Sequence, residues 1–315
     1  MKCYNADCIS MRSVKKEVRV VQFIHPGGEH RPSAKTIKSG GGVFPWNYGA
    51  HHRKYIKAQG DYVDCSNNYF ADECLYFWGE WEPTSMVYPI ISRPSGINMP
   101  HYIHEPFFQP STYPPYHLPH LNPQKYHRQN TDPFVFNDPF LYSLCKQDKY
   151  NVLKTLAPGS IILFGSCIAP RSSNPHFVVD TIFVVKDAIP YIPDNYLTCL
   201  HGYIPKYYDK IMGFADWKDF RPKYLYRGVS YNERHEFGGM YSYVPSKRCC
   251  VGMAGFERVI LRHADIDIIT DNLSQGIKSC VTSLDENIQR WNDILDIVKK
   301  QNFVPGVNFR FPIKK

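Results

Sequence analysis

The stretch Leu75–Pro83, which reads LYFWGEWEP, alternates large aromatic side chains with acidic and small ones. This period of two is typical of a β-strand, in which neighbouring side chains point to opposite faces. Glu80 and Glu82 then share one face with Tyr76 and Trp78, and lie roughly 6 to 7 Å apart. Such a face either lines a pocket, where the two carboxylates have different proton affinities, or is the wet side of an edge strand.

The composition indicates a globular protein with a large core. Hydrophobic residues make up 43% of the 315 residues, and the aromatic content of 15% suits both β-structure and surfaces that stack planar ligands. The formal net charge of +8 is compatible with a nucleic-acid partner. A single integrated domain over residues 1–315 is favoured, because neither an internal repeat nor a clean linker interrupts the chain.

The ten cysteines include no C-x-x-C pair, which argues against a zinc ribbon or a thioredoxin-type site. The first residues lack the apolar run of a signal peptide, and no apolar segment approaches the length of a membrane span. We therefore expect free thiols in a reducing cytoplasm, no membrane partner, and no metal or other cofactor.

Apolar and β-branched runs predict strands, and a period near 3.6 predicts helices. The fold class expected is α+β, with a mixed or barrel-like β-sheet and flanking helices. The amphipathic C-terminal helix begins after Ser283 with a capping box completed by Glu286. A second, shorter helix is expected over 141–156. The predicted strands cover 18–24, 75–83, 160–164, 177–185, 224–230 and 240–244.

The segment 83–139 holds 12 of the 25 prolines, a density that disfavours helices and central strands. Its many aromatic residues argue against a free linker, so we expect a loop or lid packed over the acidic face. It ends with Gln129, Asn130 and Asp132, which either read a base and position a water molecule or form turns.

Two further clusters are candidates for binding. The basic run at His51, His52, Arg53, Lys54 and Lys57 has interleaved aromatic residues, and is either a phosphate-contacting patch or a solvated helix face.

The second cluster is the sequence HPGGEH, which places His25, Glu29 and His30 on a turn after a strand. This arrangement allows a metal-dependent hydrolase as a further alternative.

Residues 159–167 (GSIILFGSC) and 177–185 (FVVDTIFVV) resemble barrel strands of the PUA-like superfamily, which includes EVE and ASCH domains. That resemblance, which covers about thirty residues, implies a pocket for a flipped or modified base. The wider set HPGGEH, HHRKY, FWGEWEP, QNTDPF and YRG is similar to bacterial phage-defence DNA glycosylases that act on hypermodified bases. Residues 130–134 (NTDPF) are similar to the uracil-glycosylase motif G-Q-D-P-Y but lack its glycine and glutamine.

These features together predict a DNA-acting N-glycosidase that works on a flipped base, with DNA favoured over RNA. Glu80 and Glu82 are the candidate catalytic carboxylates, with Asp132 as an alternative activator and Asn130 to orient water. The candidates for substrate binding are Trp46, Asn47, Trp78, Trp81 and Gln129. The alternative is a non-catalytic, PUA-like reader of modified bases, which needs the rings but no carboxylate chemistry.

Overall fold

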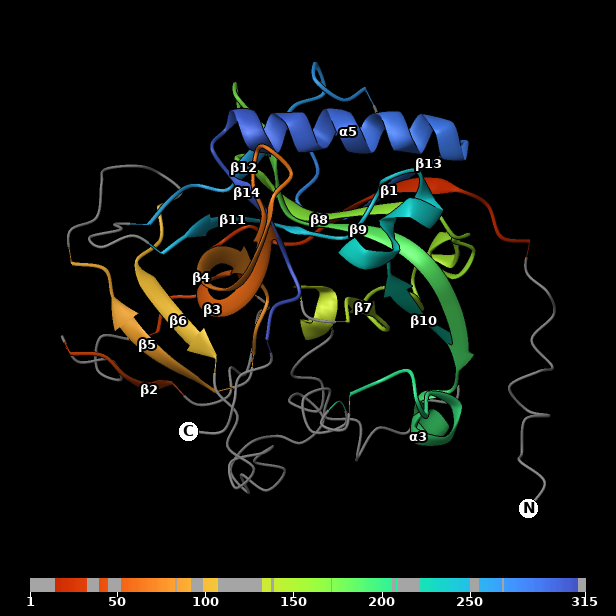
Figure 1. Ribbon diagram of the computed structural model, residues 1–315, viewed down its shortest axis with the longest axis horizontal. Coiled ribbons are helices and arrows are strands. Elements are labelled where there is room, and N and C mark those ends of the chain that lie inside the picture. The colour runs from red at the N-terminus through yellow and green to blue at the C-terminus, as the bar shows by residue number, and fades with distance from the viewer. Residues whose placement is uncertain are drawn as a thin grey trace.

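The computed structural model describes residues 15–32, 40–44, 52–82, 84–91, 99–106, 132–136, 139–170, 172–205, 208, 221–249, 255–267 and 269–310. Within them the chain forms two mixed β-sheets and few helices, which confirms an α+β protein built on mixed sheets (Figure 1).

The first sheet has the strand order β13-β1-β8-β9-β10-β7, and β12 pairs with residues Phe177–Val179 of β9. Strands β1 and β8 are parallel, whereas β9 is antiparallel to β8, β10 and β12. The strands span Arg19–Ile24 (β1), Leu141–Tyr142 (β7), Ile161–Ile168 (β8), His176–Tyr191 (β9), Lys223–Gly228 (β10), Val259–Leu261 (β12) and Gly276–Val281 (β13).

The second sheet has the order β14-β11-β4-β3-β6-β5-β2, and β14 also pairs with β3. The pairings of β3, β4, β11 and β14 therefore close into a cycle. The strands span Gly42–Phe44 (β2), Lys54–Val63 (β3), Tyr69–Gly79 (β4), Ser85–Pro89 (β5), Tyr102–Pro106 (β6), Val244–Arg248 (β11) and Val304–Val307 (β14).

Both faces of the first sheet are covered, which explains why its strands read as continuous apolar runs. Val20 and Val21 are adjacent in β1 and belong to different core clusters, and both are fully buried. Gly165 in β8 marks a register shift against β9, where a Cβ atom would lie 2.1 Å from the carbonyl oxygen of Val178. Only glycine allows the two strands to approach so closely at this point.

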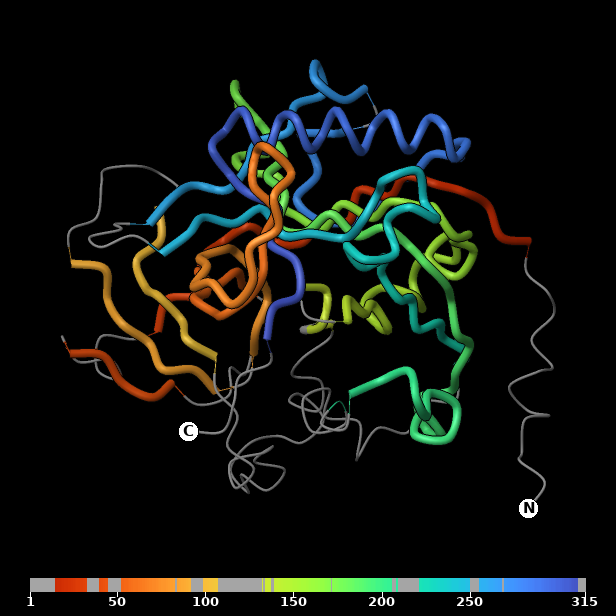
Figure 2. Tube along the Cα trace, viewed as in Figure 1, coloured from red at the N-terminus to blue at the C-terminus, as the bar shows by residue number. Residues whose placement is uncertain are grey.

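Helix α5, Leu284–Lys300, lies along one side of the molecule and covers a face of the first sheet (Figure 1). The predicted capping box is confirmed: Ser283 and Glu286 bond reciprocally at its start. Its apolar stripe is core packing, and the indole Nε1 of Trp291 donates to the carbonyl of Tyr241 at 3.0 Å. The hairpin of β3 and β4 reaches the far end of α5, where Lys299 Nζ contacts Asn67 Oδ1 at 3.2 Å (Figure 2).

The remaining helical segments are short. They are α3 at Tyr196–Cys199 and the 3-10 turns η2 at Pro133–Phe136, η3 at Asn151–Lys154, η4 at Pro193–Asn195 and η6 at Tyr231–Phe237.

The predicted helix over 141–156 is wrong. These residues form β7, a run of turns and η3, because several of their backbone N–H groups donate to a side chain and not to a helix carbonyl. The carboxylate of Asp132 accepts the N–H groups of residues 143–145, and Lys146 adopts a left-handed φ of 62°. Each of these features is incompatible with a continuing α-helix.

Two other strand and loop predictions need correction. Strand β11 begins at Val244, so the prediction of 240–244 is displaced, and 259–261 forms β12. The proline-rich segment is not wholly a loop, since it contributes β5 and β6, with Pro89 and Pro106 at their ends, where a missing N–H is tolerated. The part from 107 to 131 lies outside the described residues.

Candidate active site between the two sheets

The turn that follows β1 joins the two sheets. His25 N donates to the carbonyl of Gly165 in β8 at 2.8 Å, while Arg53 N donates to the carbonyl of Gly28 at 3.0 Å. A Cβ atom on Gly27 would lie 2.9 Å from Ile168 Cδ1 and 3.0 Å from Ser166 Cβ, so the turn passes close to β8. The HPGG sequence therefore brings the beginning of β3 against the ends of β1 and β8.

Arg53 is the centre of a buried network of charges. Its Nη1 donates to Glu80 Oε2 at 2.8 Å, and its Nε lies 2.8 Å from Asp180 Oδ2. Arg258 Nη1 lies 3.4 Å from Asp180 Oδ1, and its Nη2 donates to the carbonyl of Gly27 at 2.7 Å. The four side chains are between 3% and 7% exposed. Burial lowers the pKa of Arg53, but the carboxylates of Asp180 and Glu80 outweigh burial and raise it, so the guanidinium stays charged.

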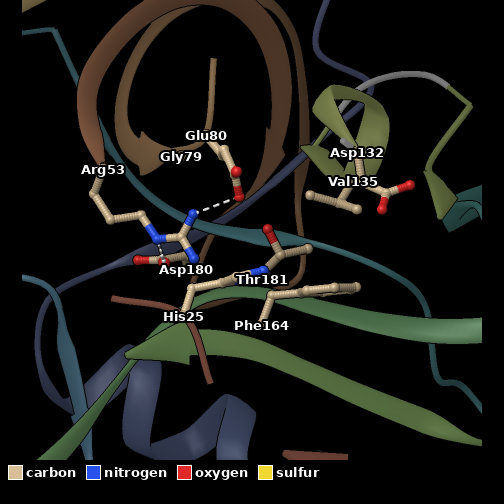
Figure 3. A pocket seen from close by; sticks show the side chains of 9 residues that line it. All are labelled: His25, Arg53, Gly79, Glu80, Asp132, Val135, Phe164, Asp180 and Thr181. Carbon is tan, nitrogen blue, oxygen red and sulfur yellow. Dashed lines mark hydrogen bonds and ion pairs between the residues drawn. The ribbon is translucent and has the colours of Figure 1, made fainter. Parts of the chain in front are cut away.

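A small cavity of about 10 Å³, room for about one water molecule, lies beside this network, between the two sheets (Figure 3). Glu80 and the Arg53 guanidinium form one side, with Asp180 below them, and Asp132 and Val135 lie opposite. The residues that line it are His25, Arg53, Gly79, Glu80, Asp132, Val135, Phe164, Asp180 and Thr181.

Asp132 anchors the turn that follows β7. Its Oδ1 accepts the backbone N–H of Ser143 at 2.6 Å, and its Oδ2 accepts that of Cys145 at 2.6 Å. Burial raises the pKa of Asp132 to about 7, against the opposing effect of these hydrogen bonds. The carboxyl group is therefore close to half-protonated near neutral pH, a property suited to proton transfer.

His25 and the turn anchored by Asp132 meet at the edge of the cavity. His25 Nε2 lies 3.4 Å from Cys145 Sγ. The neighbouring Lys146 donates from Nζ to the carbonyl of Ile24 at 2.5 Å, and burial lowers the pKa of this lysine to about 8. An imidazole, a thiol and an ammonium group therefore lie close together here, and His25 is the one of the three that lines the cavity.

A second buried pair lies one residue beyond Arg53 and two residues beyond Glu80. Lys54 Nζ contacts Glu82 Oε1 at 3.2 Å, and both side chains are 1% exposed. The rings of His30 and His104 lie nearby, with centroids 6.3 Å apart. Burial, with the charge of Lys54, lowers the pKa of His30 to about 4 and also lowers that of His104. Neither Lys54 nor Glu82 lines the cavity.

The alternation seen in LYFWGEWEP extends past the end of β4, since Trp81 belongs to the same core cluster as Leu75 and Phe77. Leu75 and Phe77 belong to one core cluster and Tyr76 and Trp78 to the other, as a strand requires. Beyond Gly79, where β4 ends, Glu80 turns to Arg53 and the cavity, and Glu82 turns to Lys54. The alternative of a wet acidic face is wrong, since both side chains are buried, whereas the placement of the two carboxylates on one face stays a prediction.

The two tryptophans proposed to stack a base are part of the core. Trp78 is 4% exposed and donates from Nε1 to the carbonyl of Phe256 at 2.9 Å; Trp81 is 1% exposed and donates to the carbonyl of Thr84 at 3.3 Å. Neither ring lines the cavity. Phe164 is the aromatic residue that does.

The basic run is not a solvated patch or a helix. Arg53 and Lys54 are buried in ion pairs at the start of β3, because each faces a carboxylate beyond the end of the neighbouring strand. Lys57 is partly exposed and pairs with Glu105 at 2.6 Å. His52 lies beside His30, with ring centroids 6.3 Å apart. His51, Trp46, Asn47, Gln129 and Asn130 lie outside the described residues.

The three side chains of the HPGGEH metal hypothesis have different partners. His25 contacts Cys145, Glu29 Oε2 contacts His101 Nδ1 at 2.5 Å, and His30 packs against Phe44 and two other histidines. Within the described ranges, no group of three His, Cys, Asp or Glu side chains is arranged to hold a metal ion.

Sequence reasoning missed two of the four network residues. Asp180 has a visible signal, since a carboxylate inside the apolar run FVVDTIFVV must have a buried partner. Arg258 has none, because it lies in an irregular stretch before β12.

Comparison with models of protein families, with curated proteins and with solved structures finds no match for this chain. The resemblances to glycosylases and to PUA-like strands therefore stay predictions. None of the described helices has both the length and the apolar character that a membrane crossing needs.

Proposed function

We propose that this protein is a DNA-acting N-glycosidase that hydrolyses the bond between a flipped, modified base and its sugar in the cavity between the two sheets. The observation that carries the proposal is the pair of unlike carboxyl groups on the cavity wall. Glu80 is ion-paired with Arg53, whereas burial raises the pKa of Asp132 to about 7. Two carboxyl groups with separated proton affinities are the usual equipment of glycoside hydrolysis.

The cost of the charge network supports a functional role for it. Moving charged groups out of water costs several kcal/mol for each ion, and an apolar core of the same volume is often as stable. Arg53, Glu80, Asp180 and Arg258 are nevertheless buried together beside a cavity. Charges kept in this way, next to a group with a shifted pKa, are typical of functional sites.

The lining of the cavity, but not its volume, suits a small planar ligand. Ligand pockets begin at about 300 Å³. This cavity of about 10 Å³ is far smaller, so a base can enter only if its polar and apolar walls move apart. Phe164 and Val135 offer apolar contact, while Thr181 and Arg53 offer hydrogen bonds to a base edge. An enzyme that works on a base must remove it from the stack, so an enclosed site is expected.

In the proposed reaction, the C1′–N bond breaks and a C1′–O bond to water forms. The Asp132 carboxyl donates a proton to the departing base, which leaves with the electron pair of the broken bond. The ionised Glu80 stabilises positive charge on the sugar, and Arg53 holds it in place. His25 accepts the proton from the attacking water. Glu82, outside the cavity lining, takes no part.

Base release tests this proposal directly. Labelled single-stranded and duplex oligonucleotides that carry ordinary and modified bases would be incubated with the protein, then treated with hot alkali to cut abasic sites. We expect strand cleavage at one class of base, together with the free base detected by mass spectrometry. Binding of a modified oligonucleotide without release of any base would contradict the proposal and favour a reader.

A further inference from the structure

Cys74 and Cys249 lie directly opposite each other on adjacent antiparallel strands. The register of β11 and β4 pairs Arg248 with Leu75, and the next pair outward is Cys249 with Cys74. Cys249 N donates to the carbonyl of Cys74 at 2.8 Å, so the two residues form a hydrogen-bonded pair. Residues in such pairs have Cα atoms about 5.5 Å apart, within the range that a disulfide spans.

The two thiols also face each other. A side-chain hydrogen bond links them, and Cys249 Sγ further donates to the hydroxyl of Tyr76 at 3.7 Å, on the same face of β4 as Cys74. Burial, followed by the adjoining Cys249 thiol, raises the pKa of Cys74 to about 11. The ammonium group of Lys57 is close enough to interact with both sulfurs.

The two cysteines differ in access to solvent. Cys249 is exposed, whereas Cys74 is half-buried. An oxidant in solution therefore reacts with Cys249 first, and Cys74 is the neighbouring thiol that can react next. A solvent-accessible cysteine next to a resolving cysteine is the arrangement of thiol-based redox sites.

We propose that Cys74 and Cys249 are an oxidation site that forms a reversible cross-strand disulfide. A hydroperoxide oxidises the Cys249 thiolate to a sulfenic acid, and the peroxide is reduced to water or an alcohol. The Cys74 sulfur then attacks the Cys249 sulfur, the S–S bond forms, and the hydroxyl leaves as water with the proton of Cys74. Two thiols are oxidised and one peroxide is reduced.

The position of the pair connects it with the cavity. Strand β4 runs from Cys74 to Gly79 and then Glu80, while the chain after Cys249 leads to Arg258. A bond between the two sulfurs fixes together β4, which leads to Glu80, and the end of β11, which precedes Arg258 in the chain. The oxidation site itself does not depend on the proposed glycosidase activity.

Thiol counting with peptide mapping tests the proposal. Protein reduced with dithiothreitol and freed of it would be treated with a small excess of hydrogen peroxide, then alkylated and digested without reduction. We expect a loss of two of the ten thiols, a Cys74–Cys249 cross-linked peptide, and full recovery with dithiothreitol.

Three single variants make the assignment specific. Cys74→Ser and Cys249→Ser should each abolish the cross-link, whereas Cys65→Ser, at an exposed cysteine in the turn between β3 and β4, should leave it unchanged. A cross-link that joins Cys74 to Cys250 would overturn the proposal. So would the loss of no thiol, or oxidation of Cys249 to a sulfinic acid while Cys74 stays reduced.

Discussion

Two buried ion pairs occupy similar places in this molecule, and only one of them borders the small cavity between the sheets. Arg53 with Glu80 and Lys54 with Glu82 both join the start of β3 to the chain beyond β4, at 2.8 and 3.2 Å. All four side chains are nearly inaccessible to solvent. Glu80, however, lines the cavity with Arg53, whereas Glu82 and Lys54 are sealed. Burial of charge alone does not mark a site, because a site also needs room for a ligand.

The largest effect is expected when Arg53, the cation that Glu80 and Asp180 share beside the cavity, is removed. Arg53→Met leaves the carboxylates of Glu80 and Asp180 buried without it. We expect the free energy of unfolding to fall by about 3–5 kcal/mol, because an uncompensated buried charge is that costly. Urea denaturation followed by tryptophan fluorescence measures this loss. A change below 1 kcal/mol would show that Arg53 is not the centre of the network.

The proton affinity of Asp132 predicts how base release depends on pH. As a general acid it acts in its protonated form, and its pKa is about 7. The rate of base release should therefore fall about tenfold for each pH unit above 7, as the protonated fraction falls. Single-turnover rates between pH 5.5 and 9 provide the profile. A rate that rises with pH over this range would contradict the role given to Asp132.

His30, which lies beside the sealed pair of Lys54 and Glu82, should make the free energy of unfolding depend on pH, and this effect is smaller. The pKa of His30 is about 4 in the folded protein, below its ordinary value of 6.5. Between these values the unfolded chain binds a proton that folded His30 does not, so acid lowers the free energy of unfolding.

Between pH 7 and pH 4, the free energy of unfolding should fall by about 1–2 kcal/mol less in His30→Gln than in the unsubstituted chain. The difference is no larger because the ring is partly exposed and solvent screens its charge. Denaturation at both pH values, compared with the unsubstituted chain, measures the difference. An unchanged pH dependence in the variant would show that His30 is not held neutral.

Replacing the whole sealed pair should have the smallest effect. Lys54→Met combined with Glu82→Leu removes both charges and keeps side chains of similar volume. Such replacements are often neutral, so we expect a change of about 1 kcal/mol or less in the free energy of unfolding and unaltered base release. Denaturation and the alkali-cleavage assay check the two results, and a loss of base release would assign a function to the sealed pair.

The sequence predicts the strands of this site better than the contacts between residues that are far apart in the chain. The period of two in residues 75–79 and the capping box at Ser283 depend on neighbours in the chain, and both are present in the structure. Arg53 and Glu80 are 27 residues apart, and Arg258 and Asp180 are 78 apart. Such pairs depend on strand register and on the glycines of the turn after β1, which local patterns do not reveal.

The roles predicted for the tryptophans and for the basic run were wrong for the same reason. A tryptophan beside a glutamate looks the same in a sequence whether its indole stacks a ligand or bonds to a backbone carbonyl, as Trp78 and Trp81 do. A run of histidine, arginine and lysine likewise looks solvated until the carboxylates that bury it are known. The short distance between Arg53 and Asp180 was therefore not predictable from either segment alone.

The most direct test of the account compares Glu80→Gln with Glu82→Gln under single-turnover conditions. The two variants remove equivalent buried charges, so denaturation should show similar losses of stability, and each would be assayed below its unfolding transition. Because only Glu80 lines the cavity, Glu80→Gln should lower the rate of base release by about 10²–10⁴-fold, whereas Glu82→Gln should stay within a few-fold of the unsubstituted protein. Equal rates of base release in the two variants would contradict the account.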